Sequence, residues 1–231
     1  MSFIDIAIVP ARGGSKGVIE KNLQEINGKS LTQITIEAAQ KAKVFDEIVV
    51  SSDCNKVLSL AKNLEVAGHR RSKEASSDIS TAEDVILDFI KNINIIDRYR
   101  ITYLQPTSPM RNSRHIEEAL DIANTHETNS CVSVKKVKDI PEKMVEIVGN
   151  KIKATNFDNI NLTANRQMLI QRYIPNGAIY IFPLRRFIET KKFPIVGAAP
   201  YIMDTSASVD IDSMEDLILA RQIWAINYGN N

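Results

Sequence analysis

An alternation of two patterns through the first half of the chain constrains the fold most. The β-branched apolar runs "FIDIAIVPA" (3–11), "FDEIVVSSD" (45–53) and "ITYLQP" (101–106) predict buried strands. Between the first two, Ser30 offers an N-cap and apolar residues recur at helical spacing through Ala42. Alternation of this kind is typical of a parallel sheet covered by helices on both faces. We therefore expect an α/β fold with three layers and a mostly parallel central sheet.

Further elements continue this pattern. A helix is predicted around Val57–Leu64, and another begins at a capping box formed by either Ser80 with Glu83 or Thr81 with Asp84. The last helix is expected to start at Ser213, with Asp216 as its box partner, and to run toward Tyr228. The remaining predictions are a weak strand at 65–69, a helix at 113–125, and strands at 131–137, 176–182 and 198–204.

The alternation lapses between residues 140 and 175. Residues 143–157 read as a hairpin that turns at Gly149 and Asn150, and residues 158–173 are polar and irregular. We interpret 140–175 as an excursion from the main sheet of a single domain that spans residues 1–231. Its unaccompanied strand-like segments predict a dimerisation arm.

The charge balance and the two cysteines exclude several function classes. Lys and Arg number 29 against 28 Asp and Glu, so the net charge of +1 predicts neither nucleic acid nor an anionic membrane as a partner. Cys54 and Cys131 have no metal-ligand spacing and are expected to pack as small apolar residues. The first residues lack a basic segment ahead of their apolar run, and no run reaches membrane-spanning length, so a cytoplasmic protein is expected.

The loop after the first strand, "VPARGGSKGVIEKNL" (9–23), predicts an anion site. Glycines let backbone amides approach phosphate oxygens, and the cations Arg12, Lys16 and Lys21 can neutralise them. A loop at this place also lies where open parallel sheets bind ligands. It matches neither a dinucleotide-binding fingerprint nor a P-loop, so a basic surface loop remains the alternative.

Near the C-terminus, "SVDIDS" (208–213) places two aspartates two residues apart. In an extended segment Asp210 and Asp212 would point the same way, with Val209 and Ile211 on the opposite face. Two carboxylates suit Mg²⁺ bound to a triphosphate. The alternative is that Asp212 caps the following helix and Asp210 is solvated.

Two smaller clusters carry weaker signals. "YLQPTSPMR" (103–111) gathers polar groups, among them Gln105, at the predicted ligand edge of the sheet, and its prolines could equally form only a turn. "IPNGAIY" (174–180) places Asn176 and Gly177 before a strand that contains Tyr180, and could be a strand-entry turn.

Taken in order, these segments resemble the cytidylyltransferases that activate nonulosonic acids, namely the CMP-sialic acid (N-acylneuraminate) synthetases and their legionaminate and pseudaminate relatives. The resemblance covers essentially the whole chain. It rests on "PARGGSKG" with "KNL", "IVVSSD", "EASSD", "LQPTSPMR", "NGAIY" and "SVDIDS".

The resemblance implies a nucleotidyltransferase fold, a homodimer and an Mg²⁺-dependent reaction. The anomeric C2 hydroxyl of a sialic-type acid would attack the α-phosphorus of CTP and release pyrophosphate. Its implied catalytic residues are Arg12, Lys21, Asp210 and Asp212. Asp212 would be the primary metal ligand, and Asp210 a second ligand or the group that assists deprotonation of the sugar hydroxyl. The implied CTP contacts are Ala11, Arg12, Gly13, Gly14, Lys16, Lys21, Asn22, Arg71, Ser80 and Thr81.

The implied acceptor contacts are Gln105, Lys143, Arg166, Tyr180 and Phe193. An arginine suits this role because a guanidinium binds a carboxylate through two hydrogen bonds; alone, Arg166 would read as a solvated loop residue. The chain departs from the family at Ile19–Glu20, where a proline usually precedes "KN", at Ile170 in "RQMLI", and at Ile174, where arginine is common. The departures at Ile170 and Ile174 leave the identity of the sugar acid open.

Three other functions remain as alternatives. A CMP-Kdo-type synthetase shares the early "PAR" but is not expected to combine "LQPTSPMR" with "NGAIY". Phosphatases of the haloacid dehalogenase type also use a DxD pair, but theirs follows the first strand. A non-catalytic nucleotide-binding homologue would be expected to lack Lys21 or the aspartates, all of which are present.

Overall fold

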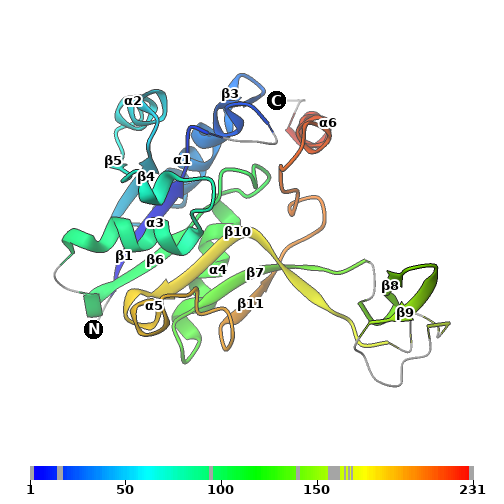
Figure 1. The fold of residues 1–231 in the computed structure, drawn as a ribbon. Coiled ribbons are helices and arrows are strands. Elements are labelled where there is room, and N and C mark those ends of the chain that lie inside the picture. The colour runs from blue at the N-terminus through cyan, green and yellow to red at the C-terminus, as the bar shows by residue number, and fades with distance from the viewer. Residues whose placement is uncertain are drawn as a thin grey trace.

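The computed structural model describes residues 3–14, 18–93, 96–138, 141–155, 162–163, 165, 167 and 169–228. Its centre is a seven-stranded sheet in the order β11-β7-β10-β6-β1-β4-β5 (Figure 1). Strand β10 runs antiparallel to β6 and β7, and the other pairs are parallel. The strands are β1 (Ile4–Pro10), β4 (Glu47–Ser52), β5 (Ala67–Arg70), β6 (Tyr99–Tyr103), β7 (Cys131–Lys136), β10 (Tyr173–Pro183) and β11 (Ala199–Ile202).

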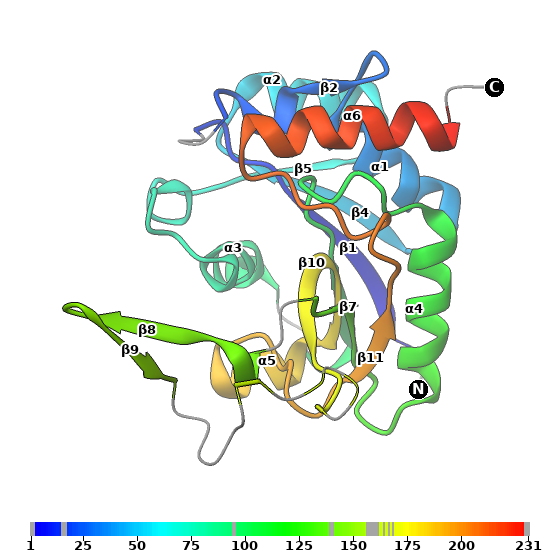
Figure 2. The same ribbon diagram turned by 90° about the vertical axis from the view of Figure 1, so that its right-hand side faces the viewer.

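Helices cover both faces of this sheet (Figure 2). Helices α1 (Leu31–Ala42) and α4 (Ser113–Thr125) pack on one face, and α3 (Ala82–Phe89) and α5 (Leu184–Thr190) pack on the other. Strand β1 is apolar along its length because both of its faces are buried. Ala7 packs in the cluster with α1 and α4, whereas Ile6 and Ile8 pack in the cluster with α3 and α5. The expected three-layer α/β architecture is confirmed.

Two helices lie beside this sandwich. Helix α2 (Asn55–Asn63) follows β4 and packs against β4 and β5. Helix α6 (Met214–Tyr228) contacts the small hairpin of β2 (Glu25–Ile26) and β3 (Lys29–Ser30), and buries Leu217 and Ala220. No helix in the described ranges is both long and apolar enough to cross a membrane.

The helix starts follow the predicted capping chemistry. The Ser30 hydroxyl accepts a hydrogen bond from the Gln33 amide at 3.1 Å. At α3 the box is formed by Thr81 with Asp84, which decides between the two predicted pairs. Ser213 and Asp216 exchange hydrogen bonds at the start of α6, as predicted.

Some of the observed elements differ from the predictions. Strand β5 begins at Ala67 rather than at residue 65, and β6 ends at Tyr103 because the following prolines turn the chain. Helix α5 is missing from the predicted elements. Cys131 is buried, and Cys54 is partly buried against the apolar cluster of β1, α1 and α2.

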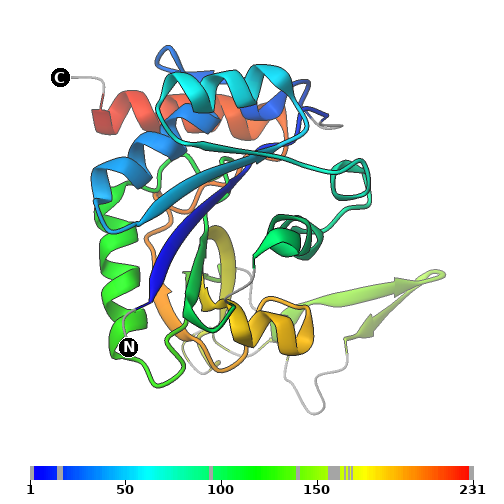
Figure 3. The ribbon, with the colours of Figure 1, turned by 90° about the vertical axis from the view of Figure 1, so that its left-hand side faces the viewer.

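The predicted hairpin is present as β8 (Val145–Val148) and β9 (Lys151–Ala154), and it turns at Gly149–Asn150. We call residues 145–154 the arm. The arm projects away from the central sheet in each view, including Figure 3, which shows the side opposite to that in Figure 2. Residues 156–157 of the predicted hairpin segment and residues 158–161, 164, 166 and 168 of the predicted irregular stretch lie outside the described residues.

Candidate active site

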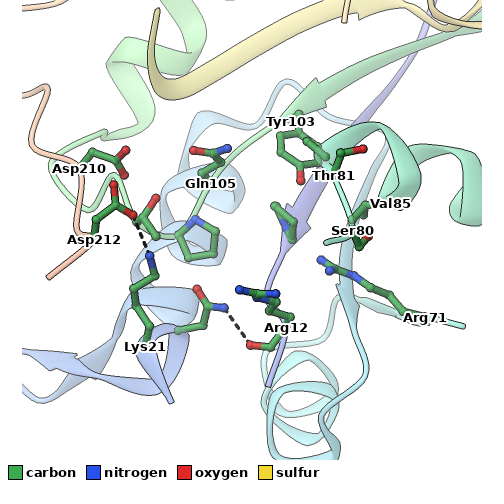
Figure 4. Close-up of a pocket in the computed structure, with 15 residues that line it drawn as sticks. Arg12, Lys21, Arg71, Ser80, Thr81, Val85, Tyr103, Gln105, Asp210 and Asp212 are labelled. Atoms are coloured by element: carbon green, nitrogen blue, oxygen red, sulfur yellow. Dashed lines mark hydrogen bonds and ion pairs between the residues drawn. The ribbon is translucent and has the colours of Figure 1, made fainter. Parts of the chain in front are cut away.

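A cavity of about 550 Å³ opens at the carboxyl ends of β1 and β6, the edge at which open parallel sheets bind ligands. Because β10 is antiparallel, its first residues also reach this edge. Nine of the predicted site residues line the cavity (Figure 4): Arg12, Lys21, Asn22, Arg71, Ser80, Thr81, Gln105, Asp210 and Asp212.

The loop after β1 brings Arg12 and Asn22 into the cavity wall. The side chain of Asn22 donates to the Arg12 carbonyl at 2.9 Å, and the Asn22 carbonyl accepts from Thr32 in α1. These bonds tie the loop to a buried helix. The guanidinium of Arg12 makes long contacts to the Ser77 carbonyl (3.4 Å) and to Asp78 (3.5 Å). Both contacts use Nη1, one of the three nitrogens of a guanidinium that carries five N–H donors.

Arg71, Ser80 and Thr81 form the wall opposite the aspartates. Arg71 is buried, its Nε donates to the Ser51 hydroxyl at 3.0 Å, and its Nη2 has no hydrogen-bond partner within the described structure. Burial lowers the pKa of Arg71, and nearby Arg12 adds to this effect. Two close cations of this kind favour an anion between them.

The hydroxyls of Ser80 and Thr81 already have partners. Ser80 donates to the Ala75 carbonyl at 2.8 Å, and the Thr81 hydroxyl exchanges hydrogen bonds with Asp84 as the cap of α3. The Thr81 hydroxyl thus caps α3. The family resemblance implies that the same residue contacts the nucleotide.

Lys21 and the two aspartates occupy the other wall. The Lys21 ammonium lies 3.0 Å from the Asp212 carboxylate, whose side chain is 80% exposed. Val209 and Ile211 pack beneath α6, so the two carboxylates face the cavity as the alternation predicts (Figure 4). Burial raises the pKa of Asp210, a hydrogen bond from Thr107 opposes this, and the Asp212 charge adds to it.

The aspartate pair fits a hard cation. Asp210 Oδ1 is buried and has no hydrogen-bond partner among the described residues, so it retains a lone pair for a further ligand. In the described ranges, no group of three or more His, Cys, Asp or Glu side chains is arranged so that it could hold a metal ion. A cation here would therefore complete its shell with water or substrate oxygens, as Mg²⁺ commonly does.

Gln105 stands between the two walls, and its position depends on Gly177. Gly177 has a φ of +80°, and a Cβ placed on it would lie 2.6 Å from Gln105 Oε1 and 3.7 Å from Asp210 Oδ2. The left-handed conformation favours glycine here, and a side chain at this position would force Gln105 to move.

Beneath Gln105 lies the fully buried guanidinium of Arg111. It donates from Nη1 to the carbonyls of Gln105 (3.1 Å) and Ala178 (3.2 Å). Burial lowers the pKa of Arg111 to about 9. This residue ties the turn after β6 to the start of β10.

Several predicted site residues do not line the cavity. Ala11 is buried and pairs with Ser51, the Gly13 amide donates to Asp53 at 2.8 Å, and Gly14 is exposed. Lys143 lies at the base of the arm. Lys16 and Arg166 lie outside the described residues.

Tyr180 and Phe193 pack behind the cavity wall rather than on its surface. Phe193 makes edge contacts with Tyr103 and Tyr180, at ring-centroid distances of 5.1 Å and 5.3 Å. Burial raises the pKa of Tyr180, and the Asp210 charge contributes. Both residues therefore shape the wall that Tyr103 presents.

Six cavity residues are not among the predicted contact residues. Tyr103 stands two residues before Gln105 in an extended chain, a spacing that could have placed both on one face. Thr107 belongs to the polar turn already noted. The other four residues are predicted only as parts of a strand, a helix or a turn: Pro10, Ala82, Val85 and Pro106.

Comparisons with known proteins place this chain in a family. The sequence model described as cytidylyltransferase matches residues 6–189. The N-acylneuraminate cytidylyltransferase of Escherichia coli O18:K1:H7 is 34% identical over 217 residues, 93% of this chain and 51% of that protein. The chain spans about half the length of the curated relatives of this kind, including those of Streptococcus agalactiae.

Other relatives match over nearly their whole length. The CMP-N,N'-diacetyllegionaminic acid synthase of Legionella pneumophila is 30% identical over 96% of this chain and 97% of that protein. Among solved structures, a CMP:2-keto-3-deoxy-manno-octonic acid synthetase complexed with CTP superposes with a TM-score of 0.69 at 14% identity, covering 96% of this chain and 98% of that one. The structural likeness supports the fold.

Proposed function

This chain belongs to the cytidylyltransferase family, and from that premise we propose that it transfers the cytidylyl group of CTP to a nonulosonic acid. The anomeric C2 hydroxyl oxygen bonds to the α-phosphorus as the bond from that phosphorus to the bridging oxygen breaks. Pyrophosphate leaves with the bond's electron pair, and the hydroxyl proton passes to a base or to water.

One observation carries this proposal: Arg12, Lys21 and Arg71 meet Asp210 and Asp212 at one cavity although the sequence separates them by up to 200 residues. Negative charge accumulates on phosphate oxygens during nucleotidyl transfer, so fixed cations at the reacting group stabilise the transition state. Lys21 lies 3.0 Å from Asp212, and we place the α-phosphate beside this cation and the carboxylate pair.

We assign the nucleoside to the wall near α3. Val85 and Ala82 supply apolar surface there, and Ser80 supplies a polar group beside Arg71. Asn22, tied to Arg12, would hold the phosphates from the other side. Lys16 keeps its predicted phosphate role as an expectation, since it lies outside the described residues.

Asp210 and Asp212 are the residues that would hold Mg²⁺, and the Oδ1 of Asp210, which has no partner among the described residues, supports this assignment. When bound, the ion would neutralise charge on the phosphate oxygens. Asp210 keeps its further predicted role, assistance in deprotonating the sugar hydroxyl. Its raised pKa is compatible with a base.

The sugar acid would bind on the side of Gln105 and Tyr103, backed by Tyr180 and Phe193. Gln105 offers both a donor and an acceptor to hydroxyl or acetamido groups. The carboxylate would need a cation; Arg166 and Lys143 keep this role as predictions.

We further propose that the arm joins two copies of the chain into a homodimer. Ile147 and Ile152 oppose each other across the hairpin and are 80% and 74% exposed. Apolar surface of this kind on a projecting hairpin favours a protein partner. At its base, Arg172 bonds the buried Glu142 at 2.8 Å, which anchors the arm to the body. Sedimentation at micromolar concentration should show a dimer, and Ile147→Asp with Ile152→Asp should give a monomer.

The deciding experiment measures pyrophosphate release from CTP and Mg²⁺ with sialic, legionaminic, pseudaminic and Kdo acids in turn. Release with one of the first three supports the proposal and names the acceptor. Release with Kdo alone would favour a CMP-Kdo-type synthetase. Tight CTP binding without release for any acid would indicate a non-catalytic homologue. The cytoplasmic location stays a prediction.

A further inference from the structure

The segment "NGAIY" begins at an irregularity of the central sheet that the proposed reaction does not use directly. Strand β10 pairs with β7 through Pro175 opposite Val134 and again through Tyr180 opposite Val132, so the register shifts between them. We call residues 176–179 the bulge. Bulges often re-aim side chains next to active sites. Asn176 opens this bulge and is only 3% exposed.

The side-chain amide of Asn176 is hydrogen-bonded on both of its ends. Oδ1 accepts from the Ser133 hydroxyl of β7 at 2.6 Å and from the Ala178 amide at 3.2 Å. Nδ2 donates to the Ser208 hydroxyl at 2.9 Å and contacts the sulfur of Met203 at 3.3 Å. A buried amide with all these partners specifies one arrangement of the three segments that supply them.

One of these segments leads directly to the aspartate pair. The chain from Met203 to Ile211 is held at its ends by two backbone hydrogen bonds of 2.9 Å, from the Met203 amide to the Val134 carbonyl and from the Ile211 amide to the Thr107 carbonyl. Ser208 lies between these ends, is buried, and precedes Asp210 by two residues. The Asn176–Ser208 bond is thus a side-chain anchor in the middle of the segment.

The bulge also meets the site from its other side. A Cβ placed on Gly177 would meet Gln105 Oε1 and approach Asp210 Oδ2, and the Ala178 carbonyl accepts from Arg111. Two consecutive residues of the bulge therefore adjoin Gln105 and the arginine that holds the Gln105 carbonyl.

We propose that Asn176 is a positioning residue of the cytidylyl transfer, which acts through Ser208 to hold Asp210 and Asp212 at the cavity. This inference rests on the proposed function. The physical reason is that a segment with fewer anchors between its ends samples more arrangements; the other bond from β7 to Ser208, from Lys135 Nζ to the Ser208 carbonyl, is long at 3.4 Å. A displacement of about 1 Å in a reacting site can cost on the order of 10²-fold in rate.

The test compares Asn176→Ala, Ser208→Ala and the double variant with Ser130→Ala as a matched control. Ser130 is equally buried and hydrogen-bonded, but it lies at the opposite end of β7. Three quantities are measured: amide hydrogen exchange of residues 204–212, Mn²⁺ affinity in the presence of CTP, and kcat with KM for CTP.

We expect both single variants to raise exchange in 204–212, to weaken Mn²⁺ binding about tenfold and to lower kcat, with KM for CTP changed less than about threefold. The double variant should bind Mn²⁺ no more weakly than Asn176→Ala, because both changes break one link. Ser130→Ala should lower the unfolding midpoint without any of these effects.

Wild-type exchange and Mn²⁺ affinity in Ser208→Ala would overturn the inference, and so would additive losses in the double variant. Ser208→Ala keeps the test decisive if Asn176→Ala fails to fold. If the wild type releases pyrophosphate with none of the four acids, the proposed function is refuted rather than the role of Asn176. Hydrogen exchange and Mn²⁺ binding do not require turnover, so they would still show whether Asn176 positions the segment that bears the aspartates.

Discussion

Replacing Gly177 by alanine tests whether the bulge sets the position of Gln105. The added Cβ enters at a φ of +80° and would lie 2.6 Å from Gln105 Oε1. The left-handed conformation costs an L-residue about 1–2 kcal/mol. For a domain of this size, that lowers the unfolding midpoint by about 2–8 °C.

The steric overlap has a different consequence because Gln105 Oε1 is the end of a flexible side chain. Rotation of Gln105 relieves the overlap at small cost in stability but moves its amide away from the acceptor. Loss of one neutral hydrogen bond, about 0.5–1.5 kcal/mol, should raise KM for the sugar acid roughly 2–10-fold. KM for CTP should change less.

Gly28→Ala is the matched control. Gly28 has a φ of +74° in the turn between β2 and β3, and its Cβ would have nothing within 4 Å. Urea unfolding and steady-state kinetics should show a similar loss of stability in both variants, and a raised acceptor KM only in Gly177→Ala. If Gly177→Ala leaves the acceptor KM at the wild-type value, Gln105 is not positioned in this way and the reasoning is refuted.

Three further predictions concern the aspartates and cysteines. Asp212→Asn should keep its unfolding free energy within about 0.5 kcal/mol, since the side chain is exposed, yet lose Mg²⁺-dependent pyrophosphate release about 10²-fold; retained activity would contradict the metal assignment. Burial raises the pKa of Asp88, but hydrogen bonds from Lys91 and Ser72 outweigh this effect and lower the pKa to about 2. Asp88→Asn should therefore destabilise the protein by about 1–2 kcal/mol at pH 7, and urea unfolding should show this difference vanish as pH falls from about 4 to 2. Burial raises the pKa of the Cys131 thiol to about 12, so a thiol reagent at pH 7 should modify Cys54 first, and equal rates would contradict the packing.

Much of the fold could be predicted because its signals are local. Strand β1 and helices α1 and α4 match the predicted ranges closely, since periodicity and capping residues act within a few positions. Helix α5 was missed because it follows β10 directly, without a capping side chain to mark its start. The exact start of α3 needed the structure to choose between two neighbouring boxes.

The sequence by itself determined the residue types of the site: a basic glycine loop after the first strand, a polar turn near Gln105 and an aspartate pair near the C-terminus. Local chemistry states what such groups can bind, and their order along the chain carried the family resemblance. The sequence could not show which hydroxyl and amide groups would be free to bind a ligand. Thr81 and the Gly13 amide are already bonded to Asp84 and Asp53.

Only the tertiary structure decided which groups face one another. It brought Lys21 to Asp212 across 191 positions, left Asp210 Oδ1 without a described partner, and placed Asn176 between β7 and the segment that bears both aspartates. The physical reason is that distances across a sheet edge depend on strand order and on a shift of register, which arise from packing between distant segments. No local pattern in the sequence encodes them.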